Sequence, residues 1–233
     1  MGPLFRRSQD IHAIAHGMTN EASPLRVGSA SNPIRCAVLI SGSGSGMQVM
    51  VTHQQLHPEC GHRTTVVISD QPKASGLLKA ESLGIPAHYI LLPDGSDSLT
   101  RRHQHEQLIQ HLLEEYEVEL ILLSGYMRLV SADFVDRWAP RIINIHPSLL
   151  PAFPGAHAHR DVLAAGAVVS GCTVHYVDAG MDSGEILGQR RVPVFNDDDE
   201  SSLAERVKIE EHQLYPEVID KIALSANFNR EAN

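Results

Sequence analysis

The sequence predicts an α/β domain built on a Rossmann-like open sheet, mostly parallel with a mixed C-terminal part, and with helices on both faces. Short apolar runs rich in β-branched residues alternate with helix-compatible stretches, the pattern of strands joined by crossover helices. The first run ends in a turn rich in Gly and Ser that precedes a helix. The last two runs have no long helix between them, so antiparallel pairing is expected at that end.

The elements follow in order along the chain. Five runs predict the parallel strands: Cys36–Ile40, Thr65–Ile68, His88–Leu92, Glu119–Leu123 and Ile142–Ile145. The helices expected between them are Met47–Leu56, Ser75–Leu83 and Leu99–Glu117. Two further strands are expected at about Gly171–Val177 and Ile186–Val194. A final helix, about Ser202–Leu224, follows acidic residues that suit the positive end of its dipole.

Length and composition indicate one globular domain. The chain has 233 residues, of which 42% are hydrophobic and 20% charged, and these values are ordinary for a protein with a sizeable core. We expect residues 35–226 to form this domain. Residues 1–34 lack sustained periodicity and are expected to be a disordered extension with room for a short helix around residues 10–16, and residues 227–233 are expected to be a C-terminal tail.

Net charge and cysteine content indicate which classes of binding partner and which cellular compartment to expect. The formal net charge of −9 argues against a nucleic-acid-binding surface, which needs a basic stripe. No apolar run reaches the length of a membrane span. Three scattered cysteines, Cys36, Cys60 and Cys172, are typical of a reducing compartment. We therefore expect a cytoplasmic protein with small-molecule substrates and no nucleic-acid or membrane partner, and we leave a homodimer open.

An Asn and a His stand at the tip of the fifth predicted strand. Asn144 and His146 are two residues apart, so their side chains point to the same face, and Pro147 ends the strand. An amide beside an imidazole suits a carbonyl reaction, with Asn144 as oxyanion donor and His146 as proton carrier. A capped turn with a surface histidine explains the same spacing, and spacing alone does not choose between the two.

The turn after the first strand reads Ser41-Gly42-Ser43-Gly44-Ser45-Gly46. Backbone N–H groups in such a turn, beside the N-terminus of a helix, suit a phosphate. The glycine spacing does not match a dinucleotide fingerprint, and the lysine of a Walker loop is missing. The alternative interpretation is a tight connection without a ligand.

A loop between the two late strands carries two carboxylates, Asp178 and Asp182, and two glycines that permit unusual backbone angles. A buried carboxylate close to His146 would favour the imidazolium and hold the ring in place. From composition alone a solvated acidic turn is the simpler interpretation. Spacing does not choose between the two aspartates.

Together these segments resemble the phosphoribosylglycinamide formyltransferases of purine synthesis, over about residues 35–224. The resemblance rests on segments in the same order and spacing: Val38–Gly42, Leu123–Arg128, Ile143–Pro151, Phe153–Gly155, Gly171–Val177, Met181–Gly184 and Val192–Val194. In that family an Asn, a His and an Asp form the catalytic triplet. The triplet falls on Asn144, His146 and Asp182, so the resemblance selects Asp182 over Asp178.

The resemblance implies formyl transfer from the co-substrate 10-formyltetrahydrofolate to the amine of 5-phosphoribosylglycinamide. Asn144 and protonated His146 would stabilise the tetrahedral oxyanion, while Asp182 supports the charge on the histidine and a relay of protons through water. The phosphoribosyl substrate is expected at Gly44, Ser45, Gly46, Lys208, Glu210 and Glu211. The folate is expected at Arg102, Met127, Arg128, Leu129, Val130, Asn144, Asp178, Ala179, Gly180, Met181 and Asp182.

Two positions depart from the family pattern. The phosphate loop of the family usually reads Gly-Asn-Gly-Ser-Asn, so Gly46 lacks a side-chain amide that the family has. Glu185 stands where the family often has a proline. Neither departure touches the catalytic triplet, so substrate identity is affected more than the formyl-transfer chemistry.

The 14 histidines raise the question of a metal. The closest pairs are His157 with His159 and His103 with His105. Without clustered cysteines or an H-E-x-x-H motif, no metal is expected. The resemblance instead implies that His157 lies near the rim of the active site, and His159 is expected to cap or pack.

Three other functions share part of the pattern. A methionyl-tRNA formyltransferase would need a C-terminal RNA-binding domain and a basic surface, whereas this chain is acidic and ends soon after its last predicted helix. A formyltetrahydrofolate hydrolase would need an N-terminal regulatory domain far longer than 34 residues. A catalytically silent nucleotide-binding module would not need an intact triplet.

Overall fold

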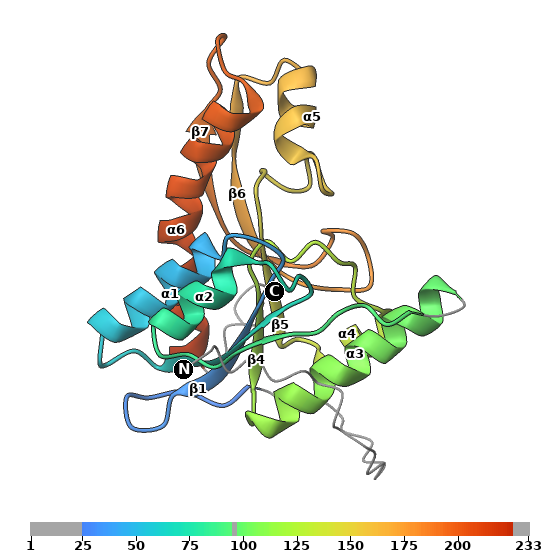
Figure 1. Cartoon of the computed structure of the whole chain (residues 1–233). Helices are drawn as coiled ribbons and strands as arrows, with labels where there is room; N and C mark the ends of the chain where they lie inside the picture. The colour runs from blue at the N-terminus through green and yellow to red at the C-terminus, as the bar shows by residue number, and fades with distance from the viewer. Residues whose placement is uncertain (1–24, 95–96, 226–233) are drawn as a thin grey trace.

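Seven strands form one sheet in the order β3-β2-β1-β4-β5-β6-β7 in the computed structural model, which describes residues 25–94 and 97–225 (Figure 1). They are β1 (Ile34–Ile40), β2 (His62–Ser69), β3 (Ala87–Tyr89), β4 (Leu120–Leu123), β5 (Ile142–His146), β6 (Val169–Tyr176) and β7 (Ile186–Pro193). The first five are parallel, whereas β6 runs antiparallel to β5 and β7 antiparallel to β6. The predicted class, a mostly parallel open sheet with a mixed C-terminal part, is confirmed.

Helices cover both faces of the sheet, as predicted (Figure 1). They are α1 (Ser45–Leu56), α2 (Ser75–Ser82), α3 (Ser98–Glu115), α4 (Ala132–Trp138), α5 (Ala158–Ala164) and α6 (Glu200–Leu224). The apolar layer on one face is built with α1, α2 and α6, and the layer on the other with α3 and α4. None of the helices in the described ranges combines the length and the apolar character that crossing a bilayer requires.

Strand β1 separates the two apolar layers. Val38 and Ile40 point into the layer under α1, α2 and α6, whereas Ala37 and Leu39 point toward α3 and α4. Successive side chains of a strand alternate between faces, and a central parallel strand is covered on both. This explains why β1 appears in the sequence as one continuous apolar run.

The structure adds two short helices that the sequence pattern does not predict, α4 and α5. Each has only seven residues, too few to establish a helical repeat. Helix α4 begins at a capping serine, because Ser131 Oγ accepts a hydrogen bond from Phe134 N at 3.2 Å. Strand β3 is shorter than the expected run and ends at Tyr89. The other boundaries differ from expectation by a few residues.

Residues 25–34, expected in the N-terminal extension, pack against the domain. Arg26 makes a two-point contact with the carboxylate of Glu119, at 2.6 and 2.8 Å. Gly28 N donates to the carbonyl of Ala223 at 2.7 Å. These contacts are single pairings without a repeat, so the sequence pattern does not reveal them. The expected helix around residues 10–16 and the expected tail lie outside the described residues.

The carboxyl ends of β1, β4 and β5 meet at one edge of the sheet, where ligands of open α/β sheets bind. Tyr215 of α6 lies beneath this edge. Its hydroxyl is 3.1 Å from the carbonyl of Leu123 and 3.0 Å from that of Ile143. The last helix is thereby held against the ends of β4 and β5.

Candidate active site

A cleft of about 1020 Å³ opens at this edge of the sheet. Its walls are the turn after β1, the segment after β4, the tip of β5, the loop between β6 and β7, and α6. Every site residue expected from the sequence lines this cleft except Glu210.

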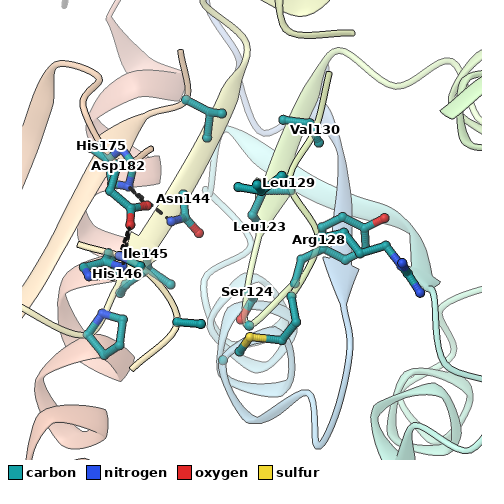
Figure 2. Close-up of a pocket in the computed structure, with 18 of the residues that line it drawn as sticks. Leu123, Ser124, Arg128, Leu129, Val130, Asn144, Ile145, His146, His175 and Asp182 are labelled. Atoms are coloured by element: carbon teal, nitrogen blue, oxygen red, sulfur yellow. Dashed lines mark hydrogen bonds and ion pairs between the residues drawn. The ribbon is translucent and has the colours of Figure 1, made fainter. Parts of the chain in front are cut away.

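Asn144, His146 and Asp182 converge in the cleft (Figure 2). His146 Nδ1 lies 3.4 Å from Asp182 Oδ2. The same carboxylate oxygen accepts a hydrogen bond from Gly155 N at 2.7 Å. The two residues of β5 therefore share a face, as their spacing predicts, and the loop between β6 and β7 brings the carboxylate to them.

Both ring nitrogens of His146 face acceptors. Nδ1 faces Asp182, and Nε2 lies 2.9 Å from the carbonyl oxygen of Phe153. Only the imidazolium form donates from both nitrogens. His146 is 4% exposed, so its ring nitrogens face these two oxygens rather than bulk water. The two acceptors therefore fix the orientation of the ring.

A second histidine, His175 of β6, belongs to the same group, although the sequence pattern predicts no role for it. Its Nδ1 lies 2.8 Å from the carbonyl of Tyr176, and its Nε2 lies 3.1 Å from Asn144 Nδ2. Burial lowers the pKa of His175, which favours the neutral ring. The neutral ring donates from Nδ1 to the carbonyl and accepts at Nε2 one amide hydrogen of Asn144. The other amide hydrogen of Asn144 remains for a ligand.

The structure distinguishes the two aspartates of the β6–β7 loop. Asp178 accepts hydrogen bonds from Gly180 N and Ser183 Oγ, at 3.0 and 2.9 Å, within its own loop. Asp182 instead faces His146. Its φ is +52°, in the left-handed region that a residue with a side chain rarely adopts. Such backbone conformations cost about 1–3 kcal/mol and are concentrated at functional sites.

The glycine-rich turn forms one end of the cleft. Gly44 has φ +63° at the start of α1, and a β-carbon there would lie 2.8 Å from the Cα of Gly76, so glycine is required. Without a capping side chain, the first N–H groups of α1 are available to an anion. Gly46 faces Ser124 of the β4–α4 segment, because a β-carbon at Gly46 would lie 2.5 Å from Ser124 Oγ.

Helix α6 turns Lys208 and Glu211 into the cleft beside that turn. Burial raises the pKa of Glu211 to about 7, although the charge of Lys208 opposes the shift. Glu210 corrects the sequence expectation. It lies on another face of the helix, where its carboxylate accepts a hydrogen bond from Arg190 at 3.1 Å. Adjacent helical positions point in directions about 100° apart, so the two glutamates cannot share a wall.

The structure corrects the expectation that His159 caps or packs. His159 lines the cleft, whereas His157 is exposed at the start of α5. Burial lowers the pKa of His159 and of its neighbour in the cleft, His212. The sequence gives no phase for so short a helix, so it does not indicate which histidine points inward.

The opposite wall is formed by residues 127–130, and Figure 2 shows this segment across the cleft from Asn144. Met127 and Leu129 are 70% and 58% exposed, so they present apolar surface to a ligand. Arg128 Nε lies 2.7 Å from the buried carboxylate of Asp70, and Met127 N donates to Ser41 Oγ at 2.8 Å. The wall is thereby attached to the ends of β1 and β2.

Comparison with known proteins is consistent with this geometry. Residues 34–219 match the family described as formyl transferase. Over 186 residues the chain is 36% identical to the phosphoribosylglycinamide formyltransferase of Escherichia coli strain K12, covering 80% of this chain and 85% of that protein. Over 217 residues it is 37% identical to the human trifunctional purine biosynthetic protein adenosine-3, covering 90% of this chain but only 21% of that protein.

Solved structures are also similar to this chain. The glycinamide ribonucleotide transformylase 1 of Symbiobacterium toebii is 42% identical with a TM-score of 0.77, and the match covers 82% of this chain and 88% of that one. The phosphoribosylglycinamide formyltransferase of Brucella melitensis is 40% identical with a TM-score of 0.76, covering 83% and 97%.

Proposed function

The chain belongs to the formyl transferase family, and we propose that it transfers the formyl group of 10-formyltetrahydrofolate to the amine of 5-phosphoribosylglycinamide in de novo purine biosynthesis. The observation that carries the proposal is the 3.4 Å contact between His146 and Asp182 beside Asn144. These groups lie between the uncapped N-terminus of α1 and an apolar wall. The cleft thus suits a phosphate at one end and a flat ring system at the other.

The reaction joins the substrate amine nitrogen to the formyl carbon and breaks the bond from that carbon to N10 of the folate. The carbonyl oxygen becomes an oxyanion in the tetrahedral intermediate. We assign its stabilisation to Asn144 Nδ2, whose second amide hydrogen is available, and to the imidazolium of His146. As the intermediate collapses, the proton lost by the amine passes to N10, and Asp182 and His146 assist this transfer through water. No net oxidation or reduction occurs.

For the phosphoribosyl substrate, we assign the phosphate to the backbone N–H groups of Gly44, Ser45 and Gly46 and to Lys208. A helix N-terminus and an ammonium group together suit a dianion. Glu211 is assigned to the ribose, because a carboxylate accepts hydrogen bonds from hydroxyl groups. Glu210 is left out because it pairs with Arg190.

For the folate, we assign the ring system to the segment Met127, Arg128, Leu129 and Val130 and to the facing loop 178–182. The apolar wall supplies contact area, and the polar backbone of the loop supplies hydrogen bonds to ring nitrogens. Arg102 also lines the cleft and offers a cation to the carboxylates of the folate tail.

We further propose a cytoplasmic location. All three cysteines are free thiols and buried, which is the usual state of cysteines in a reducing compartment. A homodimer is a separate proposal, tested by the sedimentation coefficient as a function of protein concentration.

A competition assay tests the function. The protein is incubated with 10-formyltetrahydrofolate and, in separate reactions, with phosphoribosylglycinamide, with methionyl-tRNA, or with water as the sole acceptor. We expect formyl-phosphoribosylglycinamide to form at a rate far above the release of formate. Formylation of tRNA, or formate release that the amine substrate does not suppress, would contradict the proposal and point to the other formyl-transfer functions.

A further inference from the structure

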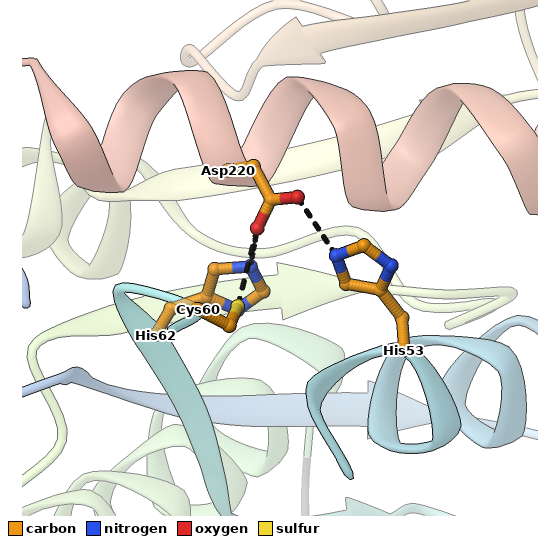
Figure 3. Close-up of side chains that lie close together, drawn as sticks. All are labelled: His53, Cys60, His62 and Asp220. Atoms are coloured by element: carbon orange, nitrogen blue, oxygen red, sulfur yellow. Dashed lines mark hydrogen bonds and ion pairs between the residues drawn. The ribbon is translucent and has the colours of Figure 1, made fainter. Parts of the chain in front are cut away.

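A second group of ionisable side chains lies away from the cleft (Figure 3). Its members come from α1, the turn before β2, the start of β2 and the last third of α6, and we call them the four-residue cluster: His53, Cys60, His62 and Asp220. One nitrogen, sulfur or oxygen atom of each lies within 4.8 Å of the others. Within residues 25–94 and 97–225, this is the group whose potential ligand atoms come together in this way.

We propose that the four-residue cluster binds a zinc ion. Two imidazoles, a thiolate and a carboxylate are the donors that Zn²⁺ takes in four-coordinate protein sites. The donor set also balances charge, because the thiolate and the carboxylate together neutralise the two positive charges of the ion. The mixture of soft sulfur with imidazole nitrogen favours zinc over magnesium or calcium, which prefer oxygen ligands alone.

The geometry is already close to that of a metal site. Asp220 Oδ2 lies 2.7 Å from His53 Nε2. Asp220 Oδ1 lies 2.9 Å from His62 Nε2 and 3.1 Å from Cys60 Sγ. In a tetrahedral zinc site, with metal–ligand bonds of about 2.0–2.3 Å, ligand atoms are about 3.3–3.8 Å apart. Binding therefore requires the donors to open around the carboxylate by a fraction of an ångström to about one ångström.

The cluster is closed on one side and open on the other. Cys60 and His62 are 5% and 0% exposed, whereas the side chains of His53 and Asp220 are 22% and 31% exposed. An ion can thus enter from solvent between the two half-buried ligands. Cys60 N donates to the carbonyl of His57 at 2.9 Å, and this turn holds the thiol in place.

The Cys60 thiol donates its hydrogen to Asp220 Oδ1 at 3.1 Å. The thiolate is the metal ligand, so zinc must displace this proton on binding. Affinity is therefore expected to rise with pH across the neutral range, and the thiol proton should appear in the buffer.

Gln54 determines which nitrogen of His62 carries the proton. Its amide oxygen accepts from Thr64 N at 2.9 Å, so its nitrogen, 2.8 Å from His62 Nδ1, donates to the ring. His62 Nε2 then carries the hydrogen that faces Asp220. Zinc at Nε2 moves that hydrogen to Nδ1, and one hydrogen bond of Gln54 is lost. A glutamate at this position would accept from both neighbours and complete the carboxylate–histidine–zinc arrangement of many sites.

The position of the cluster indicates a structural rather than a catalytic ion. His62 begins β2, whereas the cleft lies at the carboxyl ends of the strands. A bound ion would join α6 to the neighbouring elements α1 and β2, which lie far from α6 in the sequence; His62 and Asp220 are 158 residues apart. This separation explains why residue spacing predicts no metal.

The experiment measures zinc binding to the full chain. The protein is stripped with a chelator and titrated with Zn²⁺ by calorimetry in two buffers of different protonation enthalpy, and Co²⁺ is used as a spectroscopic probe. We expect one ion per chain, proton release on binding, a raised Tm, and the visible absorption of tetrahedral Co²⁺ with a thiolate ligand. Formyl transfer at low temperature should be unchanged by zinc, so this result is independent of the proposed function.

Variants distinguish a metal site from a hydrogen-bonded cluster. Cys60→Ser and Asp220→Asn should each weaken zinc affinity by more than the roughly 10–100-fold lost with a second-shell partner, whereas His111→Gln, at an exposed histidine on α3, should not change it. Gln54→Glu should tighten binding. No saturable binding, Co²⁺ spectra without thiolate ligation, or equal affinity in Cys60→Ser would overturn the proposal. If Gln54→Glu binds zinc more weakly than the parent, His62 is not a zinc ligand and the proposed four-residue site is wrong.

Discussion

Asn144 Nδ2 lies 3.1 Å from His175 Nε2, and the two residues are direct partners in the antiparallel pairing of β5 with β6. The neutral ring of His175 thereby orients the amide of Asn144. Because an oxyanion donor works only when its hydrogen is aimed before the reaction begins, His175 is a positioning residue for the proposed chemistry.

The first prediction concerns this pair. Asn144→Ala should lower kcat by roughly 10²–10³-fold, the usual effect of losing one oxyanion donor. His175→Leu should lower kcat less and leave KM nearly unchanged. In the double variant the two effects should not add, because both remove the same oriented hydrogen. Steady-state kinetics of the parent, the two single variants and the double variant measure the coupling free energy between the two residues. Fully additive losses of kcat would show that His175 does not act through Asn144.

Asp182 and His146 give a second prediction. His146→Ala and Asp182→Asn should each lower kcat by roughly 10²–10⁴-fold, with a small change in substrate affinity, because general acid–base groups act on the transition state. Asp136→Asn is the matched control, since that carboxylate is exposed on α4 and lies outside the cleft. Turnover near the parent value in Asp182→Asn, or an equal loss in Asp136→Asn, would contradict the assignment.

The convergence of these residues was partly predictable. The spacing of Asn144 and His146 predicts that they share a face, because strand geometry is local. Asp182 could be chosen over Asp178 only by resemblance, since the conformation of the loop decides which carboxylate points inward. His175 was out of reach, because its place depends on an antiparallel register set by residues far along the chain.

Helix phase explains the other errors. The resemblance implies substrate contacts for both Glu210 and Glu211, with Glu211 the better match, and the packing of α6 on β7 turns Glu210 toward Arg190. The same reason applies to His157 and His159 at the start of α5. Strand and helix order follow from hydrophobic periodicity over many residues, whereas the direction of one side chain depends on a single tertiary contact.

A third prediction tests the anion site. Lys208→Ala should weaken binding of the phosphoribosyl substrate by about 1–2 kcal/mol, the scale of one charge-assisted hydrogen bond. Folate affinity should be unchanged, because we assign the folate to the other end of the cleft. Lys73→Ala removes the same charge at an exposed position outside the cleft and serves as the control. Equal substrate dissociation constants in Lys208→Ala and the parent would show that the substrate site is misplaced.

The fourth prediction concerns stability in acid. Burial lowers the pKa of five histidines in the described residues: His62, His105, His159, His175 and His212. Below about pH 6.5 these histidines bind protons in the unfolded chain but stay neutral in the folded protein. The free energy of unfolding should therefore fall as pH drops from 6.5. Each such proton contributes up to about 1.4 kcal/mol per pH unit.

Glu211 acts in the opposite direction. Its folded pKa of about 7 lies above the ordinary 4.5, so the folded state gains a proton relative to the unfolded state as pH falls from 7 toward 4.5. Urea unfolding of the parent and of Glu211→Gln at pH 7.5 and 5.5 separates the two contributions. The parent should be less stable at pH 5.5, and the variant should lose more stability than the parent over this interval. A parent that gains stability at pH 5.5 would contradict the histidine argument.

The last prediction returns to the glycine that replaces an asparagine of the family. Restoring the amide by Gly46→Asn should tighten binding of the phosphoribosyl substrate only if the new β-carbon has space. That β-carbon would lie 2.5 Å from Ser124 Oγ, which is too close. The backbone is not the obstacle, because Gly46 does not have a positive φ. The obstacle is the Ser124 hydroxyl, which Ser124→Ala removes. Gly46→Asn alone should therefore bind the substrate no better than the parent, whereas Gly46→Asn with Ser124→Ala should bind it at least as tightly as the parent. Ser124→Ala alone is the control.

The measurements are the substrate dissociation constant and the Tm of the parent and the three variants. If the double variant folds but fails to bind, this turn accommodates a ligand of different shape, and the substrate assignment fails while the formyl-transfer chemistry of Asn144 and His146 stands.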